Sequence, residues 1–179
     1  LPISKGAKLV YFEGNHDLHI ASFWEKKLGF DIHTDAYFEK VGNYNVRLEH
    51  GDLMNPNDKN YLKWRAFARS HLGEMLAHYV PGNFWDWLGE RAAARSRART
   101  RHYGSQNEEN IRQMIRTHAK NVYSEKSFDL LISGHMHVKF DETFEADNNS
   151  VRNINLGSWM GPDPEALLID GGEVSWVKV

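Results

Sequence analysis

The stretch Phe128–His137 reads FDLLISGHMH, and it constrains the fold more than any other part of the sequence. Its first six residues have the length and apolar character of a buried strand, and a glycine and two histidines follow within four residues. Glycine lets the backbone bend close to a ligand, and imidazole offers a lone pair. Because open α/β sheets bind ligands beyond the carboxyl ends of their strands, the stretch predicts a buried strand that carries His135 and His137 to a site.

Two further motifs have the same place relative to a predicted strand. Gly14-Asn15-His16-Asp17 follows a strand expected over 7–13, and His50-Gly51-Asp52 follows one expected over 45–50. Taken singly, each motif is more typical of a turn or of a surface histidine than of a site. Since all three stand at strand ends, they can converge in space, and the combination favours one shared site.

Strand patterns open and close the chain, and helical patterns fill its middle. A helix follows Asp17 and stops at Gly29, and two strands flank a turn at Gly42-Asn43. Asp58 is a good helix N-cap, and residues 59–123 carry almost no strand signal. This order predicts a layered α/β domain with a helical insertion. The other expected strands cover 35–41, 138–146, 151–155, 166–170 and 174–179, and the three inserted helices break near Pro81-Gly82 and Gly104.

Composition excludes several classes of protein. The chain has 179 residues, 22 basic and 24 acidic side chains, and a formal net charge of −2, so it is not a uniformly basic nucleic-acid binder. Without cysteine there is no disulfide scaffold, thiolate zinc site or cysteine nucleophile. Ten histidines remain, so any bound metal would have nitrogen and oxygen ligands. No apolar run approaches the roughly 18 residues that cross a bilayer.

The three motifs together resemble the second half of the calcineurin-like metallophosphoesterase pattern, GNH(D/E)…H…GHxH. The stretch His50–Arg65 (HGDLMNPNDKNYLKWR), an arginine-rich helix and the stretch Asn155–Trp159 (NLGSW) look like the UDP-2,3-diacylglucosamine diphosphatase branch. That branch hydrolyses a lipid A precursor at its pyrophosphate. The resemblance runs from Tyr11 to about Trp159. It implies a layered β-sandwich flanked by helices, with a core over 1–58 and 124–179 and a helical cap over 59–123.

The resemblance also implies a site with two divalent metal ions. Asn15, His50 and His135 look like ligands of one metal, and His137 looks like a ligand of the other. Nitrogen and oxygen donors suit manganese, with iron, cobalt or zinc as alternatives. Such metals would lower the pKa of a bound water and neutralise charge on the phosphoryl oxygens.

The catalytic assignments fall on His16 and Asp17. In the wider superfamily this histidine lies against the phosphate, helped by the carboxylate that follows. In the diphosphatase branch we expect arginine at this position, so His16 departs from that pattern. The substrate contacts that the resemblance implies are Asn15, His16, Asp58, Arg97, Thr100 and His135.

The stretch Arg91–Arg101 holds five arginines in eleven residues. It is either a solvated helix face or, as a part of the expected cap, an anion-binding surface, since arginine forks pair well with phosphate. The aromatic residues Phe84, Trp85 and Trp87 suit an acyl-chain pocket or a membrane-facing edge, although packing between cap helices explains them as well.

The family's Asp-x-His and Gly-Asp motifs do not occur ahead of Gly14. We expect them in an upstream part of a longer chain; the alternative is a degenerate relative that no longer hydrolyses. The prediction is a metal-dependent hydrolase that converts UDP-2,3-diacylglucosamine to UMP and the lipid monophosphate, bound peripherally at the cytoplasmic face of the bacterial inner membrane. Alternatives are a phosphodiesterase or phosphatase for soluble nucleotide-like substrates, and a non-catalytic scaffold. We expect no nucleic acid and no obligate protein partner.

Overall fold

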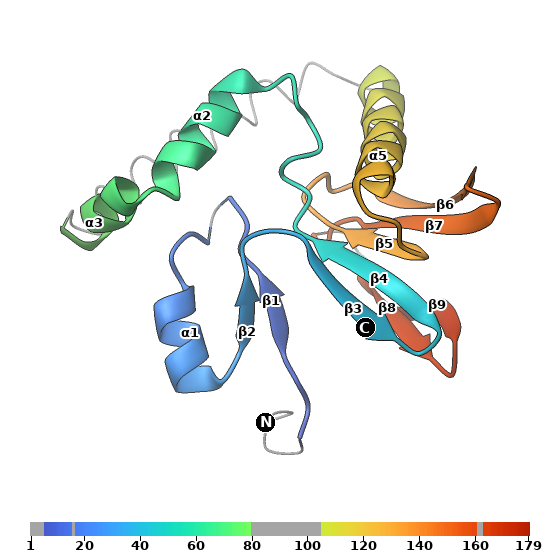
Figure 1. The fold of residues 1–179 in the computed structure, drawn as a ribbon, viewed down its shortest axis with the longest axis horizontal. Helices are drawn as coiled ribbons and strands as arrows, with labels where there is room; N and C mark the ends of the chain where they lie inside the picture. The colour runs from blue at the N-terminus through green and yellow to red at the C-terminus, as the bar shows by residue number, and fades with distance from the viewer. Residues whose placement is uncertain (1–5, 16, 80–104, 161–162) are drawn as a thin grey trace. The chain divides into compact units, whose positions relative to one another are not determined.

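The computed structural model describes residues 6–15, 17–79, 105–160 and 163–179 (Figure 1). The chain divides into two compact units, one of Leu1–Ile32 with Pro56–Glu109 and the other of His33–Asn55 with Asn110–Val179. We call them the first and the second unit. The expected division into a core and a cap stays a prediction, because much of 59–123 lies outside the described residues.

A mixed five-stranded sheet organises the second unit. Its order is β3-β4-β5-β7-β6, with parallel pairing of β4 to β5 and of β5 to β7 and antiparallel hairpins at both edges. The α/β class predicted from the sequence is therefore confirmed. The strands are β3 (Tyr37–Val41), β4 (Tyr44–Glu49), β5 (Leu130–Ser133), β6 (Lys139–Ala146) and β7 (Asn149–Leu156), and β8 (Glu165–Asp170) and β9 (Glu173–Lys178) form a separate hairpin.

The central strand β5 is covered on both faces, which explains its unbroken apolar run. Neighbouring residues of a strand point to opposite faces of the sheet. Leu131 packs with residues of helix α5 (Ser105–Glu125), whereas Leu130 packs with Val174 of the β8–β9 hairpin. Both leucines are fully buried. The strand predicted over 128–133 therefore lies at the centre of the core.

The first unit combines a two-stranded sheet with short helices. Strands β1 (Val10–Phe12) and β2 (Asp31–His33) pair, and helix α1 (Ala21–Leu28) connects them. Helix α1 ends at Gly29, which has a left-handed φ of 68°, as the sequence predicted. Helix α2 (Lys59–Ala68) begins after Asp58, whose carboxylate accepts the Tyr61 N–H at 3.0 Å, so the predicted N-cap is also confirmed.

The helix after Asp58 is interrupted earlier than predicted. Helix α3 (His71–Tyr79) starts after Ser70, whose hydroxyl oxygen accepts the Gly73 N–H at 3.2 Å and donates to the Phe67 carbonyl at 2.6 Å. Serine at this position caps a new helix, because its side chain replaces a missing backbone partner. The break predicted near Pro81-Gly82 lies outside the described residues.

Asp141 connects three strands of the second unit. Its carboxylate accepts two hydrogen bonds from the Arg152 guanidinium and one from Trp176 Nε1, all at 2.8 Å. These hydrogen bonds, led by those from Arg152, hold the pKa of Asp141 below its usual value, against the smaller opposing effect of burial. The contacts join β6 to β7 and β9.

We expect Asp141→Asn to lower the free energy of unfolding at pH 7 by about 1 kcal/mol, because the pair is partly screened by solvent. A carboxyl group with a depressed pKa in the folded state stabilises the protein above its unfolded pKa of about 3.9. That contribution is lost as the pH falls through the lower pKa of the folded state. Urea denaturation should therefore show the difference in stability between the two proteins shrinking as the pH falls from about 5 to about 2. A constant difference over this range would contradict the prediction.

Candidate functional site

His50 and His135 lie side by side in the second unit. His50 directly follows β4, and His135 stands two residues beyond β5, its parallel neighbour. His50 Nε2 and His135 Nδ1 are 3.2 Å apart, and the two rings meet edge to face. The structure therefore brings together two of the four predicted metal ligands, at the edge of the sheet where ligands were expected.

The distance between these two nitrogens suits a shared cation. A metal–nitrogen bond of about 2.0–2.1 Å with tetrahedral angles places two nitrogen ligands about 3.3–3.4 Å apart. The same separation allows one neutral imidazole to donate its N–H to the other. The distance between the two nitrogens is therefore compatible with both imidazoles as ligands of one divalent ion.

The backbone beneath the pair is tightly packed. The Gly134 N–H donates to the His50 carbonyl at 3.0 Å, which holds the two chain segments together beyond the sheet. Gly51 has a φ of 99°, and a Cβ added there would lie 3.0 Å from the Gly134 carbonyl oxygen. Glycine is therefore needed at position 51 both for its φ and for this close approach.

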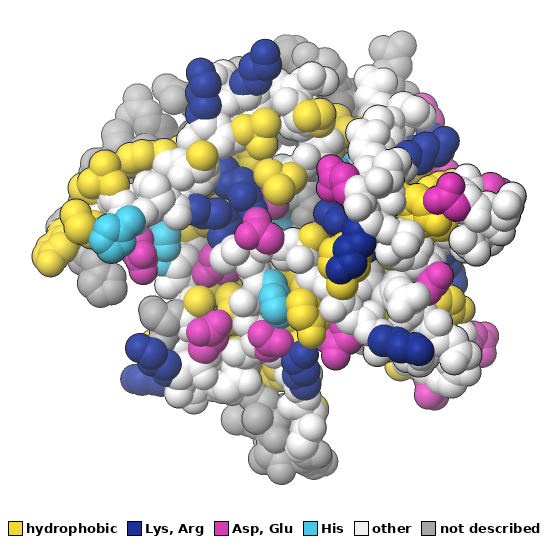
Figure 2. All heavy atoms as spheres, in the orientation of Figure 1, with side chains coloured by type: hydrophobic (Ala, Val, Ile, Leu, Met, Phe, Trp, Pro, Cys, Tyr) yellow, Lys and Arg dark blue, Asp and Glu magenta, His cyan; other side chains and the backbone are white. Residues whose placement is uncertain are grey.

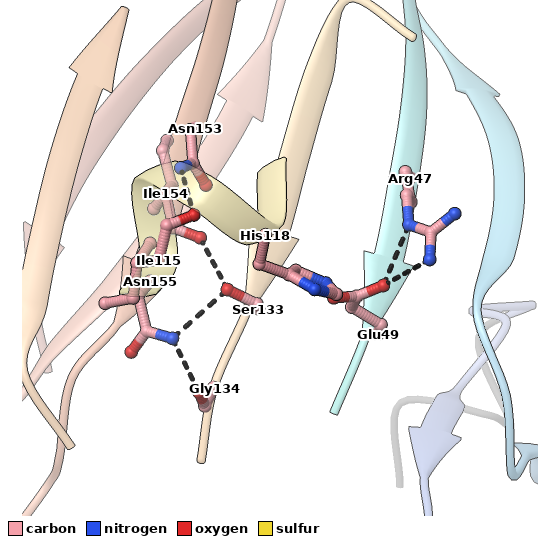
Figure 3. A network of polar contacts seen from close by, with 9 residues as sticks. All are labelled: Arg47, Glu49, Ile115, His118, Ser133, Gly134, Asn153, Ile154 and Asn155. Atoms are coloured by element: carbon pink, nitrogen blue, oxygen red, sulfur yellow. Dashed lines mark hydrogen bonds and ion pairs between the residues drawn. The ribbon is translucent and has the colours of Figure 1, made fainter. Parts of the chain in front are cut away.

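A buried asparagine holds the segment that carries His135 (Figure 3). Asn155 Nδ2 donates to the Gly134 carbonyl at 2.5 Å and to Ser133 Oγ at 3.1 Å. The Ser133 hydroxyl in turn donates to the Ile154 carbonyl at 3.2 Å. Asn155 and Ser133 are both buried, whereas Gly134, whose carbonyl Asn155 binds, is partly exposed. Asn155 begins the NLGSW stretch noted in the sequence, but its role in positioning was not predicted.

A charged triad lies next to the pair, on the α5 side of the sheet. Glu49 Oε1 accepts from His118 Nε2 at 2.5 Å, and Glu49 Oε2 accepts from Arg47 Nε at 2.8 Å (Figure 3). All three side chains are about nine-tenths buried. Burial alone would raise the pKa of Glu49, but the contacts with His118 and Arg47 outweigh it and lower the pKa. The triad was not predicted, and it fixes the residue that directly precedes His50.

The GHMH segment bends sharply after β5. His135 and His137 both have positive φ values, 64° and 56°. Left-handed backbone at non-glycine residues is uncommon and concentrates at functional sites. His137 is exposed, and among the described residues no three His, Cys, Asp or Glu side chains converge as metal ligands. The assignment of His137 to a second metal therefore stays a prediction.

Asn15 and Asp17 belong to the first unit, where they follow β1. The Tyr11 hydroxyl donates to Asp17 Oδ2 at 2.8 Å. Burial and this contact with Asp17 raise the pKa of Tyr11 to about 12, so Tyr11 stays a donor at neutral pH. His16, between the two, lies outside the described residues.

The remaining predicted substrate contacts are only partly described. Asp58 caps helix α2 through its carboxylate, which is sufficient to explain its presence. Arg97 and Thr100 lie outside the described residues, as do the aromatic residues Phe84, Trp85 and Trp87. Along the described ranges, no helix has the length and apolar character required to cross a bilayer.

Comparison with known proteins shows that the chain is a distant homologue of UDP-2,3-diacylglucosamine hydrolases. It is 26% identical over 157 residues to the one from Xanthomonas oryzae pv. oryzae (strain PXO99A), covering 86% of this chain and 64% of that protein. It is 26% identical over 166 residues to the one from Ectopseudomonas mendocina (strain ymp), covering 93% of this chain and 66% of that protein. The resemblance predicted from the motifs is thereby confirmed. The chain spans about two thirds of the length of these relatives.

No protein-family model matches the chain. Among solved structures, it is similar to a novel archaeal phosphodiesterase, with a TM-score of 0.43 and 14% identity, over 97% of this chain and 70% of that one.

Proposed function

We propose that this chain provides the His50–His135 part of a metal site that hydrolyses the pyrophosphate of UDP-2,3-diacylglucosamine to UMP and the lipid monophosphate. The observation that carries the proposal is the 3.2 Å approach of His50 Nε2 to His135 Nδ1 at the carboxyl ends of two parallel strands. Distant homology to UDP-2,3-diacylglucosamine hydrolases supports the substrate. In this proposal the two units belong to a metallophosphoesterase-type layered β-sandwich with a helical cap.

The residues have distinct roles in the proposed reaction. His50 and His135 would hold one divalent ion, with Asn15 as a neutral oxygen ligand and His137 at a second ion. Manganese is our first choice, and such ions would supply a nucleophilic water at neutral pH and offset phosphoryl charge. Asp17, held by Tyr11, would orient His16 towards the phosphate. Asp58, Arg97 and Thr100 are the proposed substrate contacts beyond the metals.

A lipid substrate also fits the surface of helices α2 and α3. Six large apolar side chains of this pair are exposed, and apolar side chains lie along it in Figure 2. Helices that expose large apolar side chains can place them in the membrane interface, so we propose peripheral contact with the cytoplasmic face of the inner membrane. The six residues are Trp64, Phe67, Leu72, Met75, Leu76 and Tyr79.

One feature of the sequence favours a second candidate, a phosphodiesterase for soluble nucleotide-like substrates. The diphosphatase branch is expected to have arginine where this chain has His16. Histidine forms a single, pH-dependent contact with phosphate, whereas arginine provides a permanently charged fork. The substrate preference of the protein therefore decides between the two candidates.

We expect the full-length protein with Mn²⁺ to release UMP from UDP-2,3-diacylglucosamine in mixed micelles, with a kcat/KM about 100-fold or more above that for bis-p-nitrophenyl phosphate. Only the lipid substrate has acyl chains, and burying their apolar groups in the protein adds binding energy that the soluble diester lacks. UMP release followed by chromatography measures both rates. Equal turnover of the soluble diester, with none of the lipid, would establish the second candidate instead.

A further inference from the structure

Glu13 is a buried carboxylate directly before the loop that carries Asn15 and Asp17. It is 3% exposed, and its two oxygens have different partners. Glu13 Oε1 accepts the Ile20 N–H at 2.9 Å, and Glu13 Oε2 accepts from Arg69 Nη1 at 3.0 Å. Glu13 and Ile20 are the two ends of the loop, so the hydrogen bond between them holds these ends together.

Arg69 connects this loop to the end of helix α2. It is the C-cap of α2, its side chain is 15% exposed, and its Nη2 donates to the Glu13 carbonyl at 3.2 Å. The guanidinium thus binds both the side chain and the backbone of Glu13, a geometry that lysine does not reproduce.

A second contact joins the same two segments. His19 Nε2 donates to the Ala68 carbonyl at 2.8 Å, at the last residue of α2. The last carbonyls of a helix lack partners within the helix, so this imidazole satisfies one of them. His19 has a φ of 64°, which shows that the loop backbone is held in an uncommon conformation. Three hydrogen bonds therefore link the loop to the end of α2, all within the first unit.

We propose that Arg69 is a positioning residue that, through Glu13, fixes Asn15 and Asp17 in the loop between Glu13 and Ile20. The inference rests on the proposed function, since it assigns the loop to the metal and phosphate site. Buried ion pairs contribute little net stability, because desolvation offsets their attraction, but they can select one conformation over others. Here the selected conformation is that of the loop, and Tyr11 holds Asp17 within it from the β1 side.

The variants Arg69→Met and Glu13→Gln test the inference, with Asp31→Asn as a matched control. Asp31 also forms an ion pair within the first unit, with Lys8, but both side chains are about half exposed. Hydrogen exchange of peptides covering the loop, Mn²⁺ affinity, kcat and KM are measured for each full-length protein. Peptides from β5 provide the reference for global stability.

We expect Arg69→Met to accelerate exchange in the loop about tenfold or more, with β5 unchanged, and to lower Mn²⁺ affinity and kcat by about tenfold each. KM should change less than threefold, because the proposed substrate contacts lie largely outside the loop. The double variant Arg69→Met, Glu13→Gln should lose no more Mn²⁺ affinity or kcat than Arg69→Met alone, since both substitutions break the same contact between Arg69 and Glu13. Asp31→Asn should match the unsubstituted protein in every measurement.

Loop exchange that rises while Mn²⁺ affinity and kcat stay unchanged would overturn the inference, because Arg69 would then have only a structural role. Retention of function in Arg69→Lys would also contradict it, since lysine cannot bind both groups of Glu13 at once. If the unsubstituted protein hydrolyses neither substrate, the proposed function fails. In that case the Mn²⁺ affinities of Arg69→Met and of the unsubstituted protein test the inference. Equal affinities would overturn it.

Discussion

His135→Ala is expected to lower turnover of UDP-2,3-diacylglucosamine by about 100-fold or more and to weaken Mn²⁺ binding by a similar factor. The substitution removes one of two imidazole nitrogens that lie 3.2 Å apart, so the remaining ring cannot chelate an ion. Losing an outer partner of a metal ligand already costs about 10–100-fold in affinity or activity, and a ligand itself should cost at least as much. Titration of Mn²⁺ and initial rates of UMP release measure the two effects.

His71→Ala is the matched control. His71 is also a histidine of the chain, but its side chain is 87% exposed and its ion-pair partner, Glu74, lies one helical turn away. We expect this variant to keep the rate and the Mn²⁺ affinity of the unsubstituted protein. His50→Ala should behave as His135→Ala does, and the double variant should be little worse than either. Full activity in His135→Ala with intact folding would reject the proposed metal site.

The sequence predicted the histidine pair because one physical rule covers both residues. Each histidine follows a predicted strand, and the carboxyl ends of parallel strands meet at one edge of a sheet. The register of β4 and β5, which pairs Glu49 with Ser133, then brings His50 close to His135. Periodicity could not show that these strands are neighbours, so the convergence was an inference from motif order.

One strand boundary depended on the exact length of a turn, which the sequence pattern did not reveal. The predicted strand over 151–155 begins two residues earlier, at Asn149, because Asp147 and Asn148 both adopt left-handed φ values and form a two-residue turn. Ala146 and Asn149 therefore form the β6–β7 pair that directly flanks the turn. Strand β2 was missed, because three residues give too short a pattern to recognise.

The charged triad was missed for a different reason. Glu49 and His118 are 69 positions apart in the sequence. Taken alone, Glu49 on its strand and His118 on its helix each have the pattern typical of an exposed residue. Their pairing depends on α5 packing over the face of the sheet that bears Leu131 and Val151, which only the tertiary structure shows. Polar contacts between distant elements are therefore the part of the site that single-sequence patterns predict least well.

Glu49→Ala is expected to lower the free energy of unfolding by about 3 kcal/mol, because it leaves Arg47 and His118 buried without their common acceptor. Glu142→Ala is the control, since Glu142 also accepts two hydrogen bonds from an arginine, Arg116, but is 42% exposed. That substitution should cost less than about 1 kcal/mol. Urea denaturation at pH 7 measures both changes.

The triple variant Arg47→Met, Glu49→Leu, His118→Leu separates charge pairing from packing. Replacing a buried charged cluster with apolar side chains of similar volume is often neutral or stabilising, so this variant should recover most of the stability that Glu49→Ala loses. Equal losses in Glu49→Ala and Glu142→Ala would contradict the prediction. The expected outcome would show that the stability of the protein next to His50 depends on the Glu49 carboxylate, whose partners Arg47 and His118 lie on β4 and α5. Contacts between distant elements would then shape the site as much as its sequence motifs do.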